Sequence, residues 1–191
     1  DQGRLAMGAE RESQRDMLSV KLFFLVLGAI AAYNFNDWLE GEPEWERLVY
    51  EPGAFAVQTA GKPDLRKMRE DLPFGEVEFQ YLMFERSEVQ YAIAYGDIPA
   101  GVGPDSAMAA ARDAIVAKMD GEILGAAEVD VADRPARQTR IQAADESLVQ
   151  IQSLLVDRRL YNLMAGGAPY AFDANPDILH FFSSFELVDP P

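Results

Sequence analysis

The chain has 191 residues, of which 49% are apolar and 26% are charged, so its length allows one compact domain and a short additional segment. Its formal net charge is −15, and all of it lies on residues 37–191, because the charges of residues 1–36 cancel. A domain this acidic repels phosphate backbones, which excludes nucleic acid as a partner. The chain has no cysteine and one histidine, which excludes disulfides, thiolate metal sites and multi-histidine metal sites.

An apolar segment near the N-terminus predicts a transmembrane helix over residues 17–39. No charged side chain occurs within residues 22–33, and a helix over residues 18–39 would be roughly 33 Å long, enough to cross a bilayer core. Lys21 lies near one end, where its ammonium group can reach the lipid headgroups. Trp38 and Trp45 suit the aromatic belt at the membrane interface. We therefore expect a membrane anchor.

Three other structures for this segment compete with a retained span. A buried core helix could use the same uncharged stretch. A cleavable signal peptide would use Arg15 and Lys21 as its basic region and residues 29–31 as its cleavage site. A helix lying flat on a membrane surface is disfavoured because the segment is apolar on all sides. The length criterion favours the retained span.

The charges that flank the span predict its orientation. The lysine and arginine residues close to it all lie on its N-terminal side, and these residues gather in the cytoplasm. We expect a cytoplasmic tail over residues 1–16, a linker over residues 40–46 and a periplasmic domain over residues 47–191. Gly28 and Ala32 form a pair of small residues one helical turn apart, which would contact other membrane helices or lipid alone.

The first half of the domain has the alternation of apolar and polar residues that is typical of β-strands. Strands are expected over residues 55–57, 77–83 and 89–95, with a turn at 51–53 before the first and a hairpin turn at 86–88 before the last. Residues 65–73 are charged and lack a clear period, so we expect a loop there.

The second half contains two predicted helices separated by strands. The first helix should follow the break at residues 96–101, capped by Asp105 or Ser106 and ending at Gly121. Strands are expected over residues 123–131, 137–143, 148–156 and 160–164, with a hairpin turn at 157–158. The last helix should begin at Asn175 and Pro176, and its apolar face consists of Ile178, Phe181, Phe182 and Phe185. This order predicts an α+β fold, an antiparallel β-sheet sandwiched with two helices.

Four fragments of the domain carry a family resemblance. They are residues 52–63 (PGAFAVQTAGKP), 91–99 (YAIAYGDIP), 158–164 (RRLYNLM) and 181–187 (FFSSFEL). Over about residues 46–188 the chain resembles the PsbP-like domains, named for the extrinsic subunit of plant photosystem II. The resemblance implies a PsbP-like fold and a non-enzymatic protein that binds a larger membrane energy-transducing assembly on its lumenal or periplasmic face. It does not include the anchor and carries over no binding residue.

The sequence contains no recognisable set of catalytic residues. His180 is expected to be a partly exposed surface residue rather than a pigment or metal ligand. Three pairs of neighbouring acids are interpreted as surface charge, although a hydrolase would need such a pair in a cleft; these are Glu76 and Glu78, Glu85 and Glu88, and Asp130 and Asp133. We therefore expect no catalytic residue, no cofactor and no metal site.

The leading hypothesis is a non-catalytic accessory subunit that stabilises a large membrane complex from its periplasmic side. A photosynthetic reaction-centre and light-harvesting assembly is the most specific form, and a respiratory complex is the nearest variant. Its partners would be the other subunits and membrane lipid. The alternative is a membrane-tethered periplasmic domain that binds a small ligand or a protein, and a carboxylate hydrolase is a third hypothesis.

Overall fold

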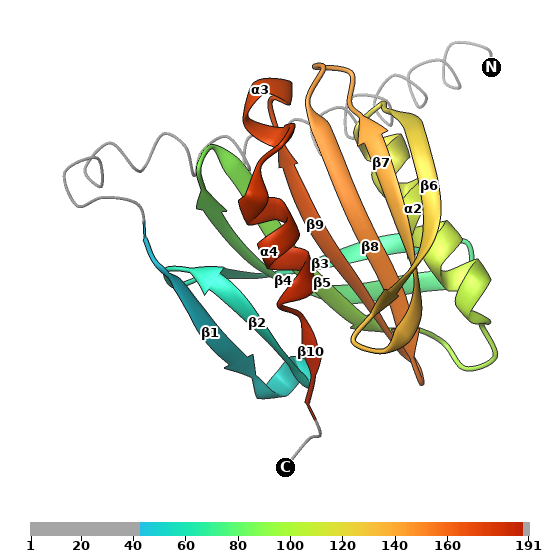
Figure 1. Cartoon of the computed structure of the whole chain (residues 1–191). Helices are drawn as coiled ribbons and strands as arrows, with labels where there is room; N and C mark the ends of the chain where they lie inside the picture. The colour runs from blue at the N-terminus through green and yellow to red at the C-terminus, as the bar shows by residue number, and fades with distance from the viewer. Residues whose placement is uncertain (1–42, 189–191) are drawn as a thin grey trace, which may run out of the picture. The chain divides into compact units, whose positions relative to one another are not determined.

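The computed structural model describes residues 43–188, which form two antiparallel β-sheets and three α-helices (Figure 1). The large sheet has seven strands in the order β3-β4-β5-β9-β8-β7-β6, and the small sheet has three in the order β1-β2-β10. The predicted transmembrane helix lies outside the described residues, as do its tail and most of its linker. Within the described part of the chain, no helix is both long enough and apolar enough to cross a membrane.

The elements have the following bounds. The large sheet consists of β3 (Asp64–Leu72), β4 (Gly75–Arg86), β5 (Val89–Asp97), β6 (Glu122–Val131), β7 (Arg134–Gln142), β8 (Leu148–Val156) and β9 (Arg159–Gly167). The small sheet consists of β1 (Trp45–Tyr50), β2 (Phe55–Ala60) and β10 (Glu186–Leu187), with a 3-10 turn at Glu51–Gly53. The helices are α2 (Pro104–Lys118), α3 (Pro169–Phe172) and α4 (Pro176–Ser183).

Both faces of the large sheet are covered. Tyr81 and Leu82 are consecutive in β4 and therefore point to opposite faces, yet both are buried. Leu82 joins the main core with Phe55 of β2 and Phe181 of α4, so the small sheet and α4 cover this face. Helix α2 packs on the other face, against β8, β7 and β3 (Figure 1). The fold is thus an antiparallel sheet with helices on either side, as the sequence predicts.

Aromatic side chains fill the core between β4, β5 and α4. The rings of Phe84 and Tyr91 stack with centroids 5.1 Å apart, and Phe181 lies 5.0 Å from Tyr91. Such pairs add about 0.5–1.5 kcal/mol beyond the burial of their area. The predicted apolar face of the last helix is confirmed for Ile178, Phe181 and Phe182, which are buried on α4. Phe185 is also buried, but it lies beyond the end of the helix at Ser183.

Most predicted elements are confirmed, including both hairpin turns and the last helix. Asn175 caps α4, since its side chain accepts a hydrogen bond from the backbone N–H of Asp177 at 3.0 Å, and Pro176 is the first helical residue. The cap predicted for the first helix is wrong. Helix α2 begins at Pro104, and its N-cap is Gly103, which precedes the predicted caps and makes no side-chain hydrogen bond.

The loop predicted over residues 65–73 is wrong, because this stretch is the edge strand β3. It pairs along its whole length with β4, from Asp64 opposite Met83 to Leu72 opposite Gly75. The inward-facing positions include Glu70, which is buried. A charged residue at a core-facing position hides the alternation that identifies a strand. Strand β1 was also not predicted, and it begins at Trp45, inside the expected linker.

Candidate functional site

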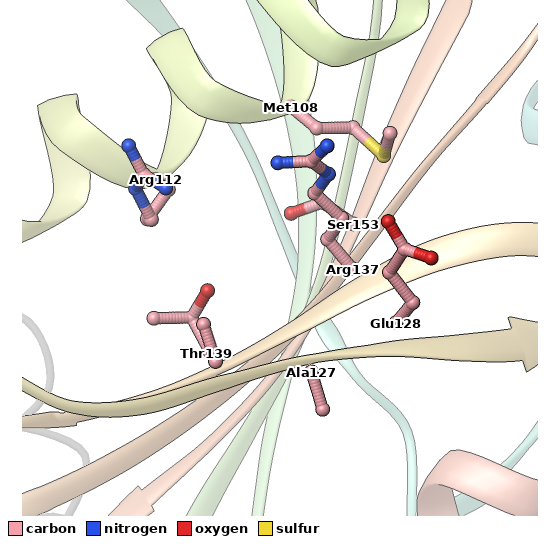
Figure 2. Close-up of a pocket in the computed structure, with 8 residues that line it drawn as sticks. Met108, Arg112, Ala127, Glu128, Arg137, Thr139 and Ser153 are labelled. Atoms are coloured by element: carbon pink, nitrogen blue, oxygen red, sulfur yellow. The ribbon is translucent and has the colours of Figure 1, made fainter.

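A groove runs between α2 and the strands β6, β7 and β8, on the face of the large sheet that α2 covers. One hollow in it has a volume of about 170 Å³ and is lined by Met108, Arg112, Glu128, Arg137, Thr139 and Ser153 together with small residues of β6 (Figure 2). A second hollow of about 330 Å³ shares Met108, Glu128 and Arg137 and adds Asp105, Asp130 and Pro135. We call the two hollows together the α2 groove.

The arrangement of the groove follows from strand alternation and register. Glu128 of β6 is paired with Arg137 of β7, so the two side chains leave the sheet on the same face. Asp105 enters from the first turn of α2, and its Oδ1 accepts a hydrogen bond from Nη2 of Arg137 at 2.9 Å. Figure 2 shows Met108 and Arg112 approaching from the helix, with the other labelled side chains on the strands. Three separate elements therefore build the site.

Some polar groups of the groove are already satisfied and others are not. Arg112 forms an ion pair with Asp113 at 2.7 Å, and the buried Ser153 hydroxyl donates to Oδ1 of Asn162 at 2.6 Å. Thr139 is only 5% exposed, and within the described residues its hydroxyl has no hydrogen-bond partner. Within the same part of the chain, the carboxylates of Glu128 and Asp130 form no ion pair. The groove therefore offers one hydroxyl and two carboxylates that have no side-chain partner among residues 43–188.

Strand β6 forms the open edge of the large sheet beside this groove. Every residue from Glu122 to Glu128 is exposed, and the side chains of Ile123 and Leu124 are 40% and 49% exposed. One irregularity in the pairing with β7 lies between Ile123 and Gly125. An edge strand presents a row of unpaired backbone N–H and C=O groups, so β6 is a second polar surface next to the groove.

The predicted anchor and interface residues fall in two places. Lys21, Gly28, Ala32 and Trp38 lie outside the described residues, and their proposed roles stay predictions. Trp45 lies in β1, where its ring packs 5.9 Å from Phe84 and 4.9 Å from His180, and its Nε1 donates to Asp177 at 3.3 Å. These contacts give Trp45 a structural role in the domain in addition to any role at a membrane interface.

His180 is an exposed residue of α4 that contacts the Trp45 ring, which confirms its predicted position on the surface. No group of three or more histidine, cysteine, aspartate or glutamate side chains that could hold a metal ion occurs among residues 43–188.

The three acid pairs differ from one another. Glu76 and Glu78 are surface residues that pair with Arg69 at 3.5 and 3.7 Å, as expected for surface charge. Burial and the nearby charge of Glu88 raise the pKa of Glu85, but the structure places it on the β4–β5 hairpin, away from the groove. Asp130 lines the groove, which its sequence position did not predict.

The residues that build the groove were missed by sequence reasoning. Asp105 was considered only as a helix cap, and Arg137 and Thr139 only as part of a strand. The alternation of Arg137, Thr139 and Ile141 places all three on one face of β7, but no local pattern shows that α2 lies above that face. The site depends on contacts between residues about 30 positions apart in the chain.

Comparisons with known proteins identify the fold. The solution structure of cyanobacterial PsbP (CyanoP) from Synechocystis sp. PCC 6803 matches with a TM-score of 0.54 and 12% sequence identity, over 77% of this chain and 94% of that one. A crystal structure of PA94, a protein of unknown function from Pseudomonas aeruginosa, matches over 71% of this chain and 91% of that one, with 10% identity and a TM-score of 0.40. No protein family and no curated protein matches the sequence. The domain formed by residues 43–188 has a PsbP-like fold.

Proposed function

We propose that the chain is a non-catalytic accessory subunit that stabilises a large membrane energy-transducing complex from its periplasmic side. The observation that carries this proposal is the PsbP-like fold, which extends over 94% of the CyanoP chain. Domains that resemble PsbP bind larger assemblies at membranes, and the same role for this chain is an argument by analogy of fold. In its most specific form the complex is a photosynthetic reaction-centre and light-harvesting assembly.

The predicted anchor supports this role. A transmembrane helix over residues 17–39, with the N-terminus in the cytoplasm, would hold the acidic domain at the periplasmic surface. The Gly28 and Ala32 pair would then allow close contact with another membrane helix. Tethering to the same bilayer raises the effective concentration of the domain at its partner, so a modest interface suffices for stable attachment.

The test is extraction of the tagged full chain from its native membranes in a mild detergent, followed by size analysis and identification of co-purifying proteins. We expect a large assembly, and pigment absorption in the same fraction would identify it as photosynthetic. A large fraction without pigment would point to a respiratory complex. Recovery of the chain as a lone monomer from membranes that keep other complexes intact would contradict the accessory role.

The α2 groove favours a second candidate function, a membrane-tethered periplasmic domain that binds a small ligand. The specific observation is the Thr139 side chain, which is largely buried, lines a hollow and makes no hydrogen bond within the described residues. A hydroxyl that faces such a hollow can donate to or accept a hydrogen bond from a small molecule. If the chain is monomeric and a small molecule released from it by denaturation is identified by mass spectrometry, this function replaces the first.

A further inference from the structure

We propose that the edge strand β6 and the adjoining α2 groove form a docking surface for an extended, basic segment of a partner protein, which adds a strand to the large sheet. The identification of that partner as a subunit of the membrane assembly rests on the proposed function. The geometry and charge of the surface do not depend on it.

The two edges of the large sheet are built differently. Strand β3, at one edge, carries Arg66, Lys67 and Arg69, and charged side chains of this kind are a common protection against unwanted strand pairing. Strand β6, at the other edge, has ten residues and contains no lysine, arginine or proline. Its one irregularity lies near the start, so the segment from Ala126 to Val131 pairs regularly with β7 and leaves a regular outer edge. One edge of the sheet therefore carries basic side chains, whereas the charged side chains of the other edge are all acidic.

The charges around β6 favour a basic partner. Glu128 and Asp130 alternate along the strand and leave it on the face of the groove. Asp105 lies across the same hollow, and Arg137 pairs with Asp105 but forms no ion pair with the other two. Lysine or arginine side chains at alternate positions of an added strand would lie opposite the two free carboxylates, and the hollow of about 330 Å³ has room for such a side chain.

A second copy of this chain is a poorer occupant. Pairing β6 with β6 would place Glu122, Glu128 and Asp130 of both copies along one pair of strands without a lysine or arginine on either strand. Like charges on neighbouring strands destabilise the pairing, and the net charge of −15 on each chain adds repulsion at longer range. The same repulsion disfavours acidic partners.

The experiment uses the full chain in detergent micelles and a synthetic ten-residue peptide of alternating valine and lysine as the probe. A matched peptide with glutamate in place of lysine is the control. We expect the lysine peptide to bind at least about tenfold more tightly, because the two peptides present the same backbone and only the lysine peptide has a charge complementary to the edge. Bound peptide should slow amide hydrogen exchange in β6 and leave β3 unchanged, since only the β6 backbone gains hydrogen bonds.

Two double variants test the contribution of the carboxylates. E128Q/D130N should weaken binding of the lysine peptide roughly fivefold, because two cross-strand charge pairs are lost. E76Q/E78Q removes two exposed carboxylates at the same spacing on β4 and should leave binding unchanged. Three outcomes would overturn the proposal. The first is an equal loss of peptide affinity in both variants. The others are peptide binding that does not slow exchange in β6, and dimerisation of the full chain that does.

The same variants separate this inference from the proposed function. If the wild-type chain purifies with a large assembly and the E128Q/D130N variant does not, the result supports both the accessory role and the docking surface. An assembly that retains E128Q/D130N unchanged overturns the docking surface and leaves the accessory role in place. A monomeric wild-type chain that binds the lysine peptide at β6 contradicts the accessory role and leaves the docking surface in place.

Discussion

Glu85 is the carboxylate whose ionisation conflicts most with its surroundings. Its Oε2 atom is buried without a hydrogen-bond partner in the described part of the chain, and burial followed by the charge of Glu88 raises its pKa. A raised pKa means that the folded state holds the proton more strongly, so the associated stability is present at acid pH and lost as pH rises through the raised pKa. We therefore expect E85Q to raise the urea midpoint at pH 7, with the difference shrinking toward pH 4.

Glu88→Gln is the control for the Glu85 prediction. It removes the charge of Glu88, the smaller of the two causes that raise the pKa of Glu85, and leaves the burial of Glu85 unchanged. It should therefore raise the urea midpoint less than E85Q does. A lower midpoint for E85Q than for wild type at pH 7 would contradict the argument, since burying an amide costs less than burying a charge.

Asp177 joins three elements through one carboxylate. It accepts hydrogen bonds from Nε of Arg86 at 3.0 Å, Oγ of Ser87 at 3.1 Å and Nε1 of Trp45 at 3.3 Å. Burial by itself would raise its pKa, but these hydrogen bonds and the charge of Arg86 outweigh burial and lower it. We expect D177N to destabilise the domain by about 2 kcal/mol at pH 7, the usual cost of losing a charged hydrogen-bond partner.

The pH dependence of D177N has the opposite sign to that of E85Q. Because the pKa of Asp177 is lowered in the folded state, its contribution is present above the ordinary carboxyl range and lost as pH falls through the lowered pKa. In urea unfolding, the wild-type chain should therefore be more stable than D177N at pH 7, and the difference should nearly disappear near pH 2. Asp173→Asn, which breaks an exposed ion pair with Arg140, should cost less than about 1 kcal/mol at either pH.

At the scale of single elements, the β4–β5 turn can be improved by a backbone change. Ser87 and Glu88 both have positive φ, 51° and 60°, which is typical of a two-residue hairpin turn that favours glycine. Glu88→Gly relieves the left-handed strain and should stabilise by about 0.5 kcal/mol after the entropic cost of glycine. It also removes the charge next to Glu85, so the total gain should be larger.

Asp133→Gly separates the two parts of that gain. Asp133 has a φ of 58° in the equivalent turn between β6 and β7. Aspartate tolerates positive φ better than glutamate, so its replacement gives a lower bound on the backbone contribution of such a turn. If D133G stabilises as much as E88G in thermal unfolding, the charge of Glu88 contributes nothing and the account of Glu85 is wrong.

The periodicity of apolar residues predicts the helices and strands correctly wherever the buried positions are all apolar. The strand over residues 148–156 was predicted with its observed bounds, and the cap of α4 followed from Asn175 and Pro176. It failed at β3, where the buried position of Glu70 is satisfied by Lys118 of α2 and by the Tyr81 hydroxyl at 3.3 Å. Lys118 is 48 residues from Glu70 in the chain, so the local sequence around β3 does not show that Glu70 has this partner.

At the scale of the molecule, the large sheet is covered on both faces and ends in two edge strands, β3 and β6. The α2 groove exists because α2 covers β7 and β8 but leaves β6 exposed. No alternation within β6 or β7 predicts which strand becomes an edge, since that depends on the order of all seven strands. The fold class could therefore be predicted from the sequence, whereas the candidate site could not.

The charge of the molecule predicts opposite effects of salt on folding and on docking. Residues 43–188 carry 24 aspartate or glutamate and 13 lysine or arginine side chains, a net charge of −11. Self-repulsion of this charge destabilises the compact state, and the exposed ion pairs that salt also screens contribute little. Raising the salt concentration from about 10 mM to about 150 mM, which shortens the screening length from roughly 30 Å to 8 Å, should increase the urea midpoint. Over the same range the lysine peptide should bind β6 more weakly. A fall in both quantities would show that attractive ion pairs, rather than net repulsion, dominate the electrostatics of the domain.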